Sequence, residues 1–242
     1  MGGKENRKMN LKTIAALLVF ICFSFAFSDG IFLDKRDGKQ YRTVKMGHFS
    51  WLAENLNYKT KGSFCYFNNE AYCQEYGRLY DIDAATKACP RGTHLSTNQE
   101  WEIIQENIVG SEEGAKKMKT SYGWHLDEIG INHCRRAEEW ANEGDRKEYY
   151  GWEPEYHCSH DGNGTDDFGF SVVPAGTGIR ENGRWIFMGV GSEARFWAKS
   201  DALGKRGKFI RIIDGNSDKF YSGGSSMGAL NRLASIRCVV DY

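Results

Sequence analysis

The chain has 242 residues, and its 32 basic side chains balance its 32 acidic ones, so it has no net charge. This balance excludes a protein that collects nucleic acid through a positive field, and we expect no nucleic-acid partner. Aromatic residues make up 14% of the chain, which excludes disorder over most of its length. A mean hydropathy of −0.58 excludes a polytopic membrane protein, and the length allows one large domain or two small ones.

Residues 1–28 have the pattern of a secretory signal peptide. An apolar run over residues 14–27 follows a basic start, and it is shorter than the roughly 20 residues that a membrane-spanning helix needs. Small residues at Ala26 and Ser28 predict cleavage after Ser28, with cleavage after Ala26 as the alternative and Met9 as a second candidate start. We therefore expect an exported protein, located in the periplasm, at the cell surface or outside the cell, with no membrane segment after cleavage.

The cysteines agree with export. Of the 7 cysteines, Cys22 lies in the expected signal peptide, which leaves an even number. In an exported chain an even number of cysteines indicates disulfides, although the sequence alone does not choose among the pairings. Nearness in the chain favours Cys65 with Cys73 and Cys134 with Cys158, and this leaves Cys89 with Cys238.

The first elements predicted after residue 28 are a hairpin and a loop-rich stretch. Residues 40–46 alternate between apolar and polar, a Gly47-His48 turn follows, and residues 49–52 return. This pattern predicts a β-hairpin over residues 38–52. Residues 58–80 are predicted to be rich in loops.

Three short helices are predicted next. Residues 83–88 are rich in alanine and end before Pro90. Thr97 and Glu100 form a T-x-x-E capping box ahead of apolar residues at helical spacing, which predicts a helix starting there. A further helix is predicted over residues 111–119.

From Gly169 onward the sequence predicts short strands separated by glycine turns. The candidates are residues 170–173, 184–188, 194–198, 209–213 and 235–240. Helices early and strands late predict an α+β fold rather than alternating βαβ units.

Several phrases occur together in an order that resembles one family. They are YRTVK (41–45), WLAENLNY (51–58), YGRLY (76–80), ACPRGTHL (88–95), NGTDDFGF (163–170), PAG (174–176), FW (196–197) and SIRCV (235–239). This combination resembles the Fibrobacter succinogenes major paralogous domain, a family of exported bacterial proteins. The likeness covers residues 37–242, after a short segment over residues 29–36.

The layout also resembles C-type-lectin-like and formylglycine-generating-enzyme-like folds. The likeness rests on a helix after the C-P-x-G-x-H-L phrase and on a late R-C-V strand. It implies a single, disulfide-stapled C-type-lectin-like domain and agrees with pairing of Cys89 and Cys238. The enzymes of the second fold hold a metal with a pair of cysteines, whereas residues 195–242 contain Cys238 alone. We therefore expect no enzyme activity of that kind.

An insertion departs from the family pattern. The family's Gly-Trp phrase is usually followed soon by N-G-T-D-D, whereas here residues 125–160 intervene. In lectin-like folds the long loop region is where ligands bind, and aromatic rings stack on sugars or anchor protein interfaces. The candidate ligand contacts are Trp140, Tyr150, Trp152 and Tyr156, together with Trp185 and Trp197. The alternative for the rings of the insertion is a satellite core under a long loop. For Trp197 the equal alternative is a core residue, because its phrase belongs to the family pattern.

Other patterns are candidates for metal or catalytic sites. Oxygen-bearing side chains alternate at Asp161, Asn163, Thr165 and Asp167, as in a calcium loop. The spacing lacks the bidentate Glu of an EF-hand, so a turn braced by its side chains is preferred, with calcium as the one cofactor alternative. His133, Cys134, His157, Cys158 and His160 form a zinc-like cluster, but cysteines in an oxidising compartment pair first.

A G-x-S-x-G pattern at residues 224–228 resembles the nucleophile elbow of hydrolases. The histidine partner normally follows the elbow in the chain, and no histidine lies beyond His160. We interpret the pattern as a glycine turn.

The sequence thus predicts an exported, non-catalytic binding module of the bacterial envelope or surface, with a glycan as the expected ligand. One alternative is a structural or protein-interaction domain of the envelope with no small ligand. A second is a metal-assisted enzyme that uses the His-rich insertion. The oligomeric state is left open.

Overall fold

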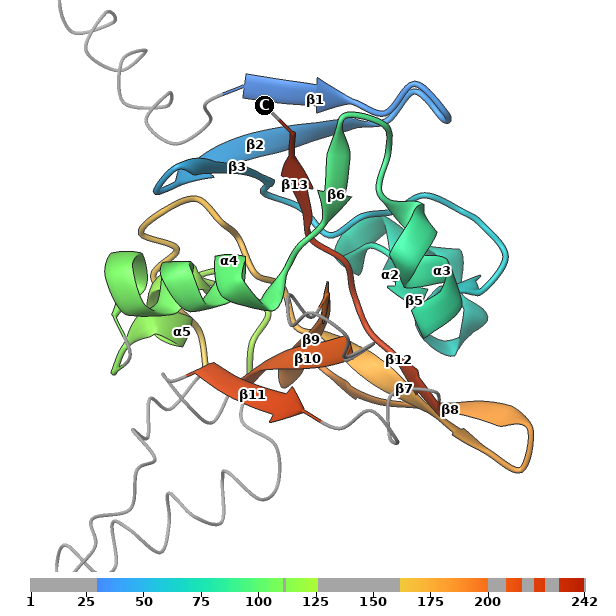
Figure 1. Cartoon of the computed structure of the whole chain (residues 1–242). Helices are drawn as coiled ribbons and strands as arrows, with labels where there is room; N and C mark the ends of the chain where they lie inside the picture. The colour runs from blue at the N-terminus through green and yellow to red at the C-terminus, as the bar shows by residue number, and fades with distance from the viewer. Residues whose placement is uncertain are drawn as a thin grey trace, which may run out of the picture.

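The computed structural model describes residues 30–110, 112–125, 162–199, 208–214, 220–224 and 231–241. These residues form two main β-sheets, with short helices at both sides of the space between them (Figure 1). The expected α+β class is confirmed. No helix in this part of the chain is long and apolar enough to cross a membrane.

The first sheet joins the start of the described chain to its end. Its strand order is β1-β2-β3-β13-β6, and all neighbours are antiparallel. The strands are β1 (Gly30–Leu33), β2 (Gln40–Met46), β3 (Phe49–Leu52), β6 (Thr93–Leu95) and β13 (Cys238–Val240). The predicted hairpin is confirmed as β2 and β3, with Val44 opposite Trp51. Because β13 lies between β3 and β6, the first sheet is complete only when this last strand has paired with both neighbours.

The second sheet contains the later strands. Its order is β11-β10-β9-β7-β12, with β8 also paired to β7. The strands are β7 (Ala175–Glu181), β8 (Arg184–Val190), β9 (Glu193–Lys199), β10 (Lys208–Asp214), β11 (Phe220–Gly224) and β12 (Arg232–Leu233). The expected strand over residues 170–173 is wrong: only Val172 forms a bridge there, and the strand begins after Pro174. Proline lacks the N–H that a ladder needs.

The predicted helices are present, and one helix was missed. They are α3 (Ile82–Ala88), α4 (Asn98–Ile104), which continues into η2 (Gln105–Val109), and α5 (Gly114–Met118). The capping box is confirmed, since the Glu100 amide donates to the Thr97 hydroxyl and the Glu100 carboxylate accepts from the Thr97 amide. The stretch predicted as loop contains β4 (Ser63–Phe64), η1 (Tyr66–Asn68), α2 (Glu70–Tyr76) and β5 (Leu79–Tyr80).

Aromatic rings from both sheets and α4 meet in the centre of the core. Trp51 of β3 makes edge contacts with Trp101 of α4 and with Phe170, at ring-centroid distances of 5.0 and 5.5 Å. Phe196 of β9 lies 5.3 Å from Trp101. All four rings are buried, and such pairs stabilise a core by about 0.5–1.5 kcal/mol beyond the area they bury.

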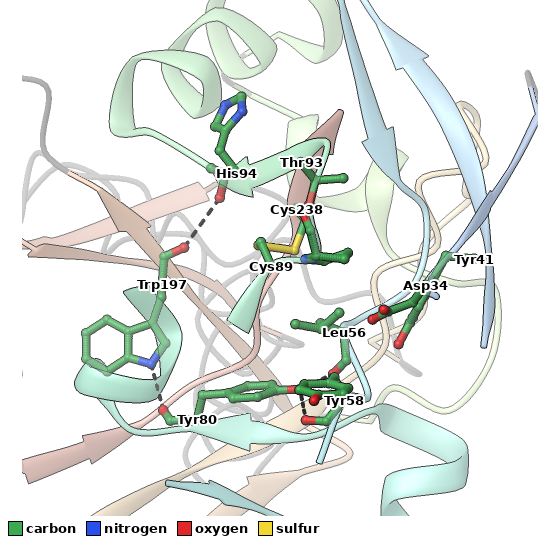
Figure 2. Close-up of a disulfide and its surroundings, with 12 residues drawn as sticks. Asp34, Tyr41, Leu56, Tyr58, Tyr80, Cys89, Thr93, His94, Trp197 and Cys238 are labelled. Atoms are coloured by element: carbon green, nitrogen blue, oxygen red, sulfur yellow. Dashed lines mark hydrogen bonds between the residues drawn. A yellow bond between two sulfur atoms is a disulfide. The ribbon is translucent and has the colours of Figure 1, made fainter. Parts of the chain in front are cut away.

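Two of the expected disulfides are formed. Cys65 is bonded to Cys73, and Cys89 is bonded to Cys238. The second bond joins the end of α3 to β13 across 149 residues of sequence (Figure 2). The third expected pair, Cys134 with Cys158, lies outside the described residues.

Trp197 lies in the core beside the second disulfide, so its expected role as a ligand contact is wrong. Its side chain is fully buried. The indole N–H donates to the Tyr80 carbonyl at 2.7 Å, and the Tyr80 hydroxyl donates to the Tyr58 carbonyl at 2.8 Å (Figure 2). A buried indole with its one donor satisfied is a packing residue.

The N-G-T-D-D phrase closes the C-terminal end of α5. Consecutive backbone N–H groups of residues 164–167 donate to carbonyls of residues 116–120, at 2.9–3.1 Å. The last carbonyls of a helix lack partners within the helix, so this loop satisfies them. The contact is close at Gly164, where a Cβ would lie 2.3 Å from the Lys116 carbonyl oxygen.

A charged cluster joins β6, α4 and the end of the chain. The His94 ring donates to Glu100 at 2.8 Å and to Asp241 at 2.6 Å. The hydrogen bond to Glu100, followed by that to Asp241, raises the pKa of His94 to about 9 against the opposing effect of burial. His94 therefore carries a positive charge at neutral pH.

We expect Gly164→Ala to destabilise the fold by about 3 kcal/mol or more, because the new methyl group meets backbone atoms that cannot rotate away. The matched control is Gly183→Ala in the β7–β8 turn, where a Cβ meets nothing within 4 Å and only the positive φ is unfavourable. The control should lose about 1 kcal/mol. Urea unfolding of both variants measures the difference, and equal losses would contradict the capping role.

We expect the His94 cluster to make stability depend on pH. Because its folded pKa of about 9 lies above the ordinary 6.5, its contribution is complete below pH 6.5 and is lost as the pH rises through 9. The free energy of unfolding of the wild type minus that of His94→Gln should therefore fall over this range. Urea titrations from pH 6 to pH 10 provide the measurement, and a difference that does not change with pH would refute the assignment.

Candidate functional site

An open polar cleft of about 450 Å³ lies beside the first sheet. Its walls come from five segments: residues 39–42 leading into β2, residues 54–57 after β3, the end of α2, residues 120–122, and the loop from Asp166 to Val173. Charged and amide groups line it, namely Lys39, Gln40, Arg42, Glu54, Asn55, Asn57, Gln74, Glu75 and Asp166. The segments are distant in sequence, so the cleft exists only in the folded chain.

A chain of polar contacts crosses the cleft. The Arg42 guanidinium donates to Glu54 at 2.5 Å on one side and to the Ser171 hydroxyl at 3.1 Å on the other. The Ser171 hydroxyl and amide both donate to Asp166, each at 2.7 Å. Glu54, Arg42, Ser171 and Asp166 thus fix one another's side-chain positions through hydrogen bonds, so this part of the cleft is preorganised.

A buried arginine holds the segments that carry these polar contacts. Arg237, in the short connection before β13, is fully buried. Its guanidinium donates to the Asn55 side chain at 2.8 Å and to the carbonyls of Phe170 at 2.7 Å, Ser171 at 2.9 Å and Leu52 at 3.2 Å. A buried cation is tolerated only when its donors are satisfied, so these segments are tied together.

Burial shifts the pKa of several groups around the cleft. It lowers the pKa of Arg237 to about 9, which still leaves the group charged at neutral pH. Burial also raises the pKa of Asp166, against the hydrogen bonds from Ser171. For Tyr76, burial and then a hydrogen bond to Glu75 raise the pKa to about 12, so this hydroxyl stays neutral.

Two tyrosines stand at the cleft with exposed or half-buried rings. Tyr76 ends α2, and its carbonyl accepts from the Asn55 side chain at 2.9 Å. The Asn57 side chain holds the same helix by donating to the Cys73 carbonyl at 2.7 Å. Tyr122 is 69% exposed, although its backbone is held by the Thr120 hydroxyl.

Ser171 is not arranged as a serine nucleophile. A serine nucleophile needs a general base that is itself oriented, usually a histidine. Ser171 instead donates to Asp166, whose two oxygens accept both the hydroxyl and the amide of the same serine. This geometry braces a turn, in which Ser171 and Asp166 both have positive φ, near 50°.

Few of the sequence-predicted ligand contacts lie in the described part of the chain. Trp140, Tyr150, Trp152 and Tyr156 lie outside it. Trp185 is half-buried on β8 and packs against Phe64 at 5.6 Å, away from the cleft lining.

The predicted calcium loop is partly described. Asn163 accepts the Trp124 amide at 3.0 Å, and Thr165 and Asp167 are exposed. Asp161 lies outside the described residues, so calcium binding stays a prediction, and the braced turn accounts for the contacts seen.

Metal chemistry finds little support among the described residues. The group there with metal-like spacing is Cys65, Glu70 and Cys73, and its sulfur atoms are bonded to each other. The zinc-like cluster at residues 133–160 and the turn over residues 225–228 lie outside them. A zinc site there, and an enzyme that would use it, stay predictions.

The phrases that the sequence shares with one family meet around Arg237. Leu52 and Asn55 belong to WLAENLNY, Phe170 ends NGTDDFGF, and Arg237 is the centre of SIRCV. The model of the Fibrobacter succinogenes major domain matches residues 44–240. The chain belongs to this family. Comparison with curated proteins and with solved structures found no match.

The major-domain phrases therefore have a structural explanation. They supply the buried arginine, its acceptors and the loop that caps α5. The cleft above them contains residues that sequence reasoning missed, among them Arg42 and Tyr76. Both stand in family phrases, which was the available signal, but no local pattern indicates that they face one cleft.

We expect Arg237→Met to destabilise the domain by about 3 kcal/mol or more, because three buried carbonyls and Asn55 lose their donor. The control is Arg42→Met, which removes an ion pair that is about 40% exposed on each side. That variant should lose about 1 kcal/mol or less. Thermal and urea unfolding distinguish the two, and similar small losses in both would contradict the supporting role of Arg237.

Proposed function

We propose that this major-domain protein is an exported, non-catalytic binding domain of the bacterial envelope or surface, and that it binds a glycan in the polar cleft. The observation that carries the proposal is the composition of the cleft. Carboxylates, a guanidinium and amides line the cleft together with two tyrosines, Tyr76 and Tyr122. Sugars offer many hydroxyls for such groups and apolar C–H faces for aromatic rings.

Support for export comes from the cysteines and from the start of the sequence. Two disulfides are formed among the described residues, and disulfides persist in oxidising compartments. The basic and apolar start of the chain has the composition of a secretory signal.

The arrangement of the chain supports a C-type-lectin-like architecture, which stays a proposal. A disulfide ties the Cys-Pro phrase after α3 to the last strand. The insertion at residues 125–160 lies in sequence between two parts of the cleft wall, residues 120–122 and 166–173. An insertion at this point would adjoin the site, as long loops do in lectins.

A protein partner is the second candidate. Ile31 and Leu33 of β1 are 60% and 47% exposed, and β1 ends the order of the first sheet. Apolar side chains on a terminal strand favour contact with another chain.

Binding can be tested with the disulfide-bonded chain that begins at Asp29. We expect it to bind at least one polysaccharide of plant cell walls or bacterial envelopes, on a glycan array and in a pull-down with insoluble polysaccharide. A folded protein that binds no glycan in either assay would overturn the proposal. Crosslinking in native envelopes that recovers only proteins would then favour the second candidate.

We expect Tyr122→Ala to weaken glycan binding by about tenfold, because a stacked aromatic ring contributes on the order of 1.5 kcal/mol. Tyr122 is 69% exposed, so the fold should be unaffected. Ile31→Ala, which removes a similarly exposed side chain from β1, is the matched control and should bind like the wild type. Isothermal titration on the best array ligand gives both affinities, and an equal affinity for both variants would place the ligand elsewhere.

A further inference from the structure

Phe67 has a backbone conformation that is unfavourable for a bulky residue. It is the middle residue of η1, and its backbone has a φ of 51°. Bulky L-residues rarely adopt this left-handed region, because the Cβ crowds the following carbonyl. The side chain is also 62% exposed, so most of its surface faces solvent. Strained backbone that presents an apolar ring to solvent is a feature of ligand sites.

The ring of Phe67 rests on a rigid base. Tyr66 lies 4.7 Å and Phe187 5.9 Å from it, measured between ring centroids, both with edge-on geometry. The segment is closed by the Cys65–Cys73 disulfide. The base supports the ring in its outward position.

A row of rings leads from Phe67 to the cleft. Its centroid lies 6.5 Å from that of Tyr72, and Tyr72 is stacked on Tyr76 at 6.1 Å with an interplanar angle of 22°. Tyr72 and Tyr76 are four residues apart on α2, so they share one face of the helix. Tyr76 lines the cleft. The three rings therefore contact one another in turn, edge-on and then stacked, and we call this set the α2 strip: Phe67, Tyr72 and Tyr76.

A single sugar can be bound by the cleft alone and would not reach Phe67, which lies beyond Tyr76 and Tyr72 in the α2 strip. A polysaccharide chain that leaves the cleft past Tyr76 would pass over the strip and contact Phe67.

We propose that Phe67 is the distal subsite for an extended oligosaccharide, one end of which lies in the polar cleft. The ligand class is thus a polysaccharide chain rather than a mono- or disaccharide. This inference rests on the proposed glycan-binding function and adds chain length as the property that is recognised.

The first test needs no ligand. In Phe67→Gly the left-handed backbone is relaxed, because glycine adopts positive φ without strain. If the ring serves binding, this variant should melt within about 2 °C of the wild type or above it. A drop of about 5 °C or more would show that Phe67 is kept for packing, and would overturn the inference.

The second test measures chain length. Cello-, xylo- and chito-oligosaccharides, each as the disaccharide and the hexasaccharide, are titrated into the wild type and Phe67→Gly by calorimetry. We expect the wild type to bind a hexasaccharide more tightly than its disaccharide, and Phe67→Gly to bind that hexasaccharide about tenfold more weakly with unchanged disaccharide affinity.

The outcomes separate the two proposals. Equal hexasaccharide affinities in the wild type and Phe67→Gly would overturn the distal subsite and leave the glycan cleft in place. A wild type that binds no oligosaccharide, here or on the array, would overturn both. Ile186→Ala on β8, which is 43% exposed and outside the strip, is the control and should behave as the wild type in each titration.

Discussion

The burial of one guanidinium is the constraint on which the rest of the structure depends. Arg237 is fully enclosed, and its donors are satisfied by carbonyl and amide oxygens from two separate parts of the chain, Leu52 with Asn55 and Phe170 with Ser171. A buried cation without these acceptors would be strongly unfavourable, so the segments after β3, around Phe170 and before β13 must assemble together. Asn55 and Ser171, which belong to two of these segments, also line the polar cleft. The interaction that stabilises the core thus also positions the candidate site.

The frame around the insertion is held on both sides. Before it, the Trp124 indole donates to the Thr120 hydroxyl and the Val172 carbonyl, and the His125 amide donates to the Gly191 carbonyl. After it, residues 164–167 cap α5. A long segment can therefore be added between these points without disturbing the fold, since loop closure costs rise slowly with length.

In the proposed glycan site, the polar cleft and the α2 strip have different roles. In that proposal, preorganised charges such as the Arg42–Glu54 pair would provide directional hydrogen bonds, and the exposed ring of Phe67 would provide apolar surface. The Cys65–Cys73 bond and the hydrogen bonds from Asn55 and Asn57 hold α2 in place. Gly77 ends this helix with a φ of 77°, where a Cβ would lie 2.7 Å from that of Asn55. Close backbone packing thus sets the position of Tyr76 relative to the cleft.

Local patterns in the sequence determined the hairpin of β2 and β3 and the capping box of α4, because each depends on a few neighbouring residues. Nearness in the chain favoured the two cysteine pairings, and only the folded structure decided them. The sequence did not reveal α2, since its disulfide-closed segment also has the composition of a loop, nor the glycine-rich strand β7. Only the tertiary structure decided that Trp197 is a core residue, since an indole pattern does not tell whether its N–H faces a ligand or the Tyr80 carbonyl. The cleft likewise depends on side chains more than 100 residues apart, such as Arg42 and Ser171, which no local periodicity brings together.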